Sequence, residues 1–163
     1  MDAGLIMNDA DTADWTLRAS TPADVEVIAE LRAVVMRPDL ERLGVYDEVR
    51  VRQRLRNHFS FDFTRIVMVD GELAGSVTLR PAEDREWLEH FYLEPRHQGR
   101  GLGTAVLAAV LEAADARHAT VALQVMQGSP ARRLYERHGF TVETEDSFDV
   151  FMVRPAAGGA TSA

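Results

Sequence analysis

A glycine-rich turn in the second half of the sequence combines the residue types that hold phosphate groups. Three glycines alternate with other residues directly before a helix-forming segment, in the order Gln98, Gly99, Arg100, Gly101, Leu102, Gly103 and Thr104. Glycine has no Cβ, so the backbone can curve tightly and its N–H groups can approach a ligand. At a helix N-terminus the dipole also favours an anion. The pattern predicts a phosphate cradle, beside which Arg96 and Arg100 add positive charge.

Three classes of phosphate ligand bind to such turns, and the residues of this sequence decide among these classes. The dinucleotide fingerprint needs a third glycine where Thr104 stands, and this turn lies in mid-chain rather than opening a βαβ unit. A nucleoside triphosphate loop needs a lysine, whereas all 18 basic residues are Arg. The third class is the pyrophosphate of coenzyme A.

The turn resembles the Q/R-x-x-G-x-G/A motif of the GNAT superfamily of N-acetyltransferases. Residues 131–140, with Ala131, Leu134, Tyr135, Gly139 and Phe140, resemble the family's A-x-x-L-Y-x-x-x-G-F signature. The resemblance in element order covers about residues 15–154. It implies an α/β single-domain GNAT fold, with a mixed central sheet of about seven strands flanked by about four helices. It also implies acetyl transfer from acetyl-CoA to a primary amine, on a small molecule or a protein.

The resemblance also assigns roles to individual residues. Backbone groups of Phe91, Tyr92 and Leu93 would hold the pantetheine arm in a gap between the fourth and fifth strands, with an N–H near Leu93 stabilising the oxyanion. Tyr135 would protonate the departing CoA thiolate, since a phenol with a pKa of about 10 keeps its proton at neutral pH. The alternative for Tyr135 is a packed ring whose hydroxyl makes a structural hydrogen bond.

The residue that deprotonates the amine is not fixed by the family. Glu89 is the first candidate, because a carboxylate among apolar neighbours should have a raised pKa. Its alternative role is a structural ion pair with one of the arginines, and His90 is the second candidate. Strand alternation places Glu89 with Phe91 and His90 with Tyr92, unless a bulge intervenes.

One position departs from the family pattern. Relatives often have Asn before the last helix to bond pantetheine, but here Gly128 stands there and Ser129 follows. Ser129 is therefore a candidate pantetheine contact, although capping of the next helix is its simpler role.

The elements that must position these residues follow from periodicity. A strand is expected at 15–19, then a helix to about residue 36 that Pro38 breaks, with a second helical segment from there through 59. Asp70-Gly71 predicts a hairpin joining strands 65–69 and 73–80. Further elements are expected as a strand at 87–93, a helix at 104–117, a strand at 119–126, a helix to 138, and strands at 141–144 and 148–154.

Composition limits the function classes. The sequence predicts one domain over 14–154, with disordered segments at 1–13 and 155–163. A net charge of −8 argues against nucleic-acid binding, and no apolar run approaches the roughly 20 residues of a membrane span. The chain has no Cys and no paired metal-ligand spacing, so we expect a cytoplasmic protein without a metal and, as is common among relatives, possible homodimerisation. A non-catalytic acyl-CoA-binding sensor is the alternative function.

Overall fold

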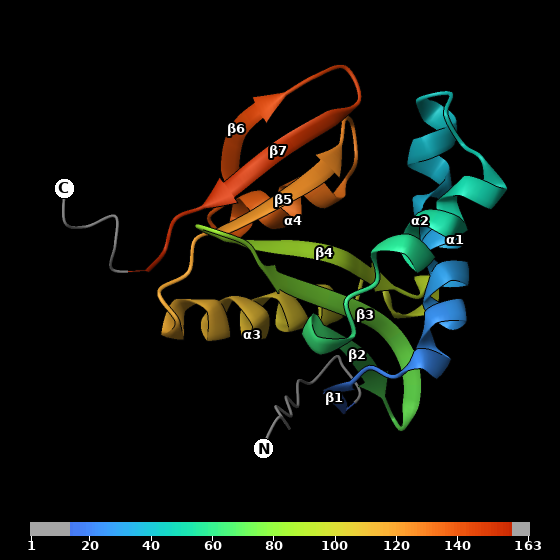
Figure 1. Cartoon of the computed structure of the whole chain (residues 1–163), viewed down its shortest axis with the longest axis horizontal. Helices are drawn as coiled ribbons and strands as arrows, with labels where there is room; N and C mark the ends of the chain where they lie inside the picture. The colour runs from blue at the N-terminus through green and yellow to red at the C-terminus, as the bar shows by residue number, and fades with distance from the viewer. Residues whose placement is uncertain (1–13, 158–163) are drawn as a thin grey trace. The chain divides into compact units, whose positions relative to one another are not determined.

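The computed structural model describes residues 14–157. The predicted disordered segment 1–13, and residues 158–163 of the predicted disordered segment 155–163, lie outside the described residues. Within them the structure contains a seven-stranded mixed sheet and four α-helices, which confirms the predicted α/β class and element order (Figure 1).

The sheet has the strand order β1-β2-β3-β4-β5-β7-β6. Its strands are β1 (Trp15–Ala19), β2 (Thr64–Val69), β3 (Glu72–Pro81), β4 (Glu86–Leu93), β5 (Val121–Met126), β6 (Thr141–Glu145) and β7 (Asp149–Arg154). The α-helices are α1 (Val25–Arg42), α2 (Glu48–His58), α3 (Leu102–Ala116) and α4 (Ala131–Arg137). No helix of residues 14–157 is long and apolar enough to cross a membrane.

By their internal contacts the described residues form two compact units. The first comprises residues 14–78 and 90–106, and the second comprises residues 79–89 and 107–157. The boundary passes through β3, β4 and α3, so the two units share these elements.

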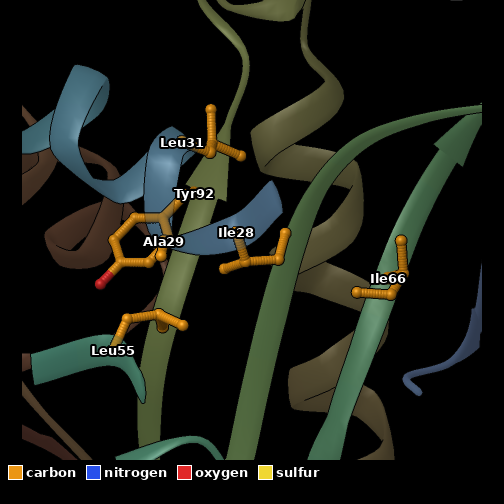
Figure 2. Close-up of a cluster of buried hydrophobic side chains, with 6 residues drawn as sticks. All are labelled: Ile28, Ala29, Leu31, Leu55, Ile66 and Tyr92. Carbon is orange, nitrogen blue, oxygen red and sulfur yellow. The ribbon is translucent and has the colours of Figure 1, made fainter. Parts of the chain in front are cut away.

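The first unit is built around a cluster of buried side chains from two helices and two strands. Its members are Ile28, Ala29, Leu31, Leu55, Ile66 and Tyr92 (Figure 2). The Asp70-Gly71 turn has positive φ angles of 51° and 83°, as a two-residue hairpin requires, and it joins β2 to β3 as predicted. Outside the core, Arg52 pairs with Glu30 and Arg56 with Glu26, which ties α2 to α1.

The prediction that the first helix ends near residue 36 is wrong. Pro38 lies inside α1, which continues to Arg42. A proline in a helix removes the bond from its own nitrogen to residue i−4, here Val34, and Val34 is exposed, so solvent can reach that position. The last turn is stabilised by the Arg37–Glu41 and Arg42–Asp39 ion pairs. The second helix begins only at Glu48, where Asp47 accepts hydrogen bonds from two backbone N–H groups.

The second unit contains the three-stranded part of the sheet formed by β5, β7 and β6. β5 pairs antiparallel with β7 along its whole length, and β7 pairs with β6. The start of β4 runs parallel to β5, with Glu86 opposite Val121 and Trp87 opposite Ala122.

Candidate active site

The predicted phosphate cradle forms a turn between β4 and α3 in the first unit. Gly99 has φ 76° and Gly101 has φ 84°, a region that residues with a Cβ adopt only under strain. A Cβ built on either glycine would meet no atom within 4 Å. The glycines are therefore required by backbone curvature, and the space beside them is open to a ligand.

The N-terminus of α3 supplies the hydrogen-bond donors of this turn. The first helical bond runs from the Ala105 N–H to the Gly101 carbonyl, at 3.0 Å. The N–H groups of Leu102, Gly103 and Thr104 precede that bond, so an α-helix offers them no internal acceptor. Leu102 is buried and anchors the helix start, whereas Gly101 and Thr104 are exposed. A diphosphate could bind here through backbone groups at the positive end of the helix dipole.

The side chains around the turn divide into structural and exposed groups. The Gln98 amide donates to the Leu93 carbonyl at 2.9 Å, which ties the turn back to β4. Arg96 is held by Glu94 and Glu72, and the hydrogen bond to Glu94 is the main cause that raises the pKa of the Arg96 guanidinium. Its charge is thus partly offset. Arg100 is exposed in the turn itself.

The end of β4 presents its backbone in two directions. A Cβ on Gly75 would lie 2.0 Å from the Tyr92 carbonyl oxygen, so that carbonyl points at β3. The Glu94 N–H also bonds toward β3, to Ala74. Because both backbone groups of a residue in an antiparallel strand point to the same side, those of Phe91 and Leu93 point away from β3. The backbone contacts of Phe91, Tyr92 and Leu93 with pantetheine stay predictions.

Glu89 has a different environment from the predicted one. Its two carboxylate oxygens accept hydrogen bonds from Arg80 at 2.9 and 2.8 Å, both within the second unit. This bond is the main cause that raises the pKa of the Arg80 guanidinium. The ion pair is the structural alternative anticipated from the sequence. A catalytic role for Glu89 stays a prediction.

Tyr135 and Ser129 also lie in the second unit. Tyr135 is 9% exposed, on α4, and its ring packs edge-on against Phe140 with centroids 5.8 Å apart. The Ser129 hydroxyl accepts a hydrogen bond from the N–H of Ala131, the first residue of α4, at 3.2 Å. The proton-donor role of Tyr135 and a pantetheine contact at Ser129 stay predictions.

The comparisons with known proteins agree with the motifs and the fold. The model of the acetyltransferase (GNAT) family matches residues 26–140. The chain belongs to the GNAT acetyltransferase family. No protein of curated function matches it in sequence.

Solved structures resemble this acetyltransferase at low sequence identity. The PaiA N-acetyltransferase of Thermoplasma acidophilum, solved with coenzyme A, has a TM-score of 0.71 and 20% identity, covering 86% of this chain and 98% of its own. The ribosomal-protein-S18-alanine N-acetyltransferase of Escherichia coli has a TM-score of 0.67 and 18% identity, covering 89% and 96%. A Salmonella typhimurium acetyltransferase that modifies the N-terminal serine of ribosomal protein L7/L12 has 0.63 and 17%, covering 86% and 94%. These likenesses support the GNAT fold.

The structure also reveals contacts of β4 that the sequence did not indicate. Arg32 of α1 donates to the Tyr92 hydroxyl at 2.9 Å, and the Ser76 hydroxyl of β3 donates to the His90 carbonyl at 2.7 Å. Both join residues far apart in the chain, so no local pattern marks them. His90 itself has φ 48°, a left-handed backbone within β4 for which a histidine gives no sequence signal. Over residues 14–157 no group of three His, Asp or Glu side chains is placed to hold a metal ion.

Proposed function

We propose that this GNAT chain transfers an acetyl group from acetyl-CoA to a primary amine. The observation that carries the proposal is the open turn at residues 98–104, where two glycines of positive φ lead into the N-terminus of α3. Membership of the acetyltransferase family supports it. The diphosphate of coenzyme A would accept hydrogen bonds from the first N–H groups of α3.

In the proposed reaction the residues of β4 and α4 have separate tasks. The Phe91 and Leu93 backbones hold pantetheine and the acetyl carbonyl, and an N–H near Leu93 stabilises the oxyanion. The amine nitrogen attacks the carbonyl carbon, a C–N bond forms and the C–S bond breaks. The nitrogen loses a proton in this step, and the candidates for taking it up are Glu89, His90 and water. Tyr135 gives its phenolic proton to the thiolate, as a general acid does.

The acceptor is proposed only as a class. By their names, one structural neighbour acts on an alanine of ribosomal protein S18, and another modifies the N-terminal serine of ribosomal protein L7/L12. A peptide α-amine therefore belongs beside small alkylamines, polyamines and aminoglycosides in the acceptor panel.

The test is release of free CoA thiol from acetyl-CoA across that panel, together with calorimetric binding of acetyl-CoA. Thiol release that depends on an amine, with an acetylated product of matching mass, supports the transferase. Tight binding of acetyl-CoA without turnover on any amine would instead favour the non-catalytic sensor. Binding of NAD in place of acetyl-CoA would mean that the turn binds a dinucleotide instead of coenzyme A.

A further inference from the structure

The outer side of the α1–α2 helix pair, in the first unit, carries apolar side chains that residues 14–157 leave exposed. Val27 and Val34 of α1 are 48% and 55% exposed, and Val49 of α2 is 69% exposed. Val27 and Val34 are seven residues apart, so they lie on one side of their helix. A single exposed valine is ordinary, whereas these three lie on two helices that are side by side (Figure 1).

Two ion pairs between the helices show how α1 and α2 are aligned. Glu26 of α1 pairs with Arg56 of α2 at 2.8 Å, and Glu30 pairs with Arg52 at 2.7 Å. In each pair both carboxylate oxygens accept a hydrogen bond from the guanidinium. The helices are therefore antiparallel, with both acids on α1 and both bases on α2.

The same alignment brings two of the valines to one level. Val34 lies one turn beyond Glu30 along α1, and Val49 lies about one turn before Arg52 along α2. Because the helices are antiparallel, both steps lead in the same direction, so Val34 and Val49 are neighbours across the helix pair. We call the following seven side chains the α1–α2 face: Val27, Val34 and Val49, with Glu26, Glu30, Arg52 and Arg56.

The α1–α2 face is balanced in charge, unlike the chain as a whole. The net charge of −8 makes two copies of the chain repel each other at long range. On the α1–α2 face, two acids and two bases cancel. A second copy would therefore meet apolar side chains there without net repulsion.

We infer that the α1–α2 face binds a second copy of this chain, about a two-fold axis that runs parallel to the two helices and between them. Such an axis lays α1 of one copy over α2 of the other, at the same level. Each acid of α1 then faces the partner's copy of the arginine that it pairs with in its own chain. Val34 faces the partner's Val49. Every contact occurs twice, as in any isologous interface.

The size of the α1–α2 face limits the strength of this dimer. The 11 residues of α2 span about 16 Å, and two packed helices are about 20 Å across. The area that the two copies bury is therefore below the roughly 1,200 Å² at which standard interfaces begin. We expect a reversible dimer with a Kd between about 10 μM and about 1 mM.

Sedimentation equilibrium over that range of concentration, without acetyl-CoA, measures the association. Val34→Glu buries a carboxylate against the partner's Val49, so the dimer Kd should rise at least about tenfold. The melting temperature should not change, because the side chain is exposed in the single chain. The matched control is Val142→Glu, at an exposed valine of β6 in the second unit. It makes the same change in charge and should leave the Kd unchanged.

A mixture of two variants tests the two-fold axis itself. In a mixed dimer of Val34→Glu with Val49→Arg, the new carboxylate faces the new guanidinium at one contact. At the other contact the original valines still face each other. An equimolar mixture should therefore associate more tightly than either variant alone, since only the mixed dimer brings the opposite charges together.

A wild type that stays monomeric at about 1 mM would overturn the inference. Equal weakening by Val34→Glu and Val142→Glu would do the same, as would a mixture no tighter than its components. The proposed acetyl transfer is tested separately, because association is measured without cofactor. A protein that releases CoA thiol with an amine but stays monomeric would overturn the dimer alone.

Discussion

At the scale of single residues, we expect Tyr135→Phe to lower kcat by roughly 10–10³-fold, because the phenol would protonate the departing thiolate. The Tyr135 ring packs on Phe140, and Phe keeps that contact, so the melting temperature and acetyl-CoA affinity should change little. The loss should shrink for a thioester with a more acidic thiol, which needs less protonation to leave. Steady-state kinetics with two acyl donors measures this. An unchanged kcat with a lowered melting temperature would make the hydroxyl structural.

The sequence identified candidate residues better than it identified their partners. Tyr135 and the glycines stand in motifs, so their positions could be read directly. Glu89 was expected among apolar side chains but pairs with Arg80, and Arg32 was not singled out although it contacts Tyr92. Both contacts depend on which residues the fold brings together, and no local spacing encodes that.

At the scale of elements, periodicity and turn chemistry predicted most of the fold. The Asp70-Gly71 hairpin and the first strand were placed correctly because both patterns are local. Pro38 led to a wrong prediction of where the first helix ends. The continuation of α1 beyond Pro38 depends on the exposed Val34 and on two ion pairs in the last turn. Whether a bulge lies in β4 was left open, and the left-handed backbone of His90 has no local residue pattern that would have predicted it.

The turn before α3 gives a prediction with an internal control. Gly101→Val places a branched side chain where the diphosphate would approach, so the acetyl-CoA Kd should rise about tenfold or more, equivalent to 1.4 kcal/mol. Gly71→Val is matched, since Gly71 has φ 83° against 84° at Gly101 and equally open surroundings. It should cost similar backbone strain and leave the Kd unchanged. Equal calorimetric Kd values of acetyl-CoA for Gly101→Val and the wild type would contradict the prediction of a phosphate cradle at this turn.

The contact between β3 and β4 gives a second element-scale prediction. A Cβ at Gly75 would lie 2.0 Å from the Tyr92 carbonyl oxygen, so Gly75→Ala must push the strands apart. We expect the free energy of unfolding to fall by about 1–3 kcal/mol, measured by denaturant titration. Gly44→Ala, in open space at φ 77°, carries only the backbone cost of about 1 kcal/mol. An equal decrease in the free energy of unfolding in both variants would mean that β3 moves away from β4 without a measurable energetic penalty.

At the scale of the whole molecule, the charge distribution makes stability depend on pH. The pKa is lowered by hydrogen bonds or ion pairs at several carboxylates of the described residues, namely Asp24, Glu26, Glu30, Asp47, Asp115 and Asp146. A lowered pKa means that the unfolded chain binds more protons than the folded chain as the pH falls. Stability should therefore decrease on acidification. The exposed pairs contribute little and are screened by salt.

Asp24 is the member of this set for which the effect should be largest, because it is buried at the start of α1. Two bonds from Arg18, at 3.0 and 2.9 Å, lower the pKa of its carboxyl, and the Thr21 N–H at 2.8 Å adds to this against the opposing effect of burial. Above the ordinary Asp pKa of 3.8 the carboxylate is charged in both states and stabilises the fold. That contribution is lost as the pH falls below 3.8 through the lowered folded value.

Asp24→Asn should therefore destabilise the protein by about 1–2 kcal/mol at pH 7, by losing the ion pair and weakening the cap. This corresponds to a melting temperature lower by roughly 3–6 °C. The difference from the wild type should shrink as the pH falls below 3.8, because the wild-type carboxyl then becomes neutral as well. Asp62→Asn, at an exposed aspartate of the same unit, is the control that changes net charge alone. Thermal melts from pH 7 to pH 3 decide the matter, and parallel curves for the two variants would show that the Arg18–Asp24 pair does not stabilise the start of α1.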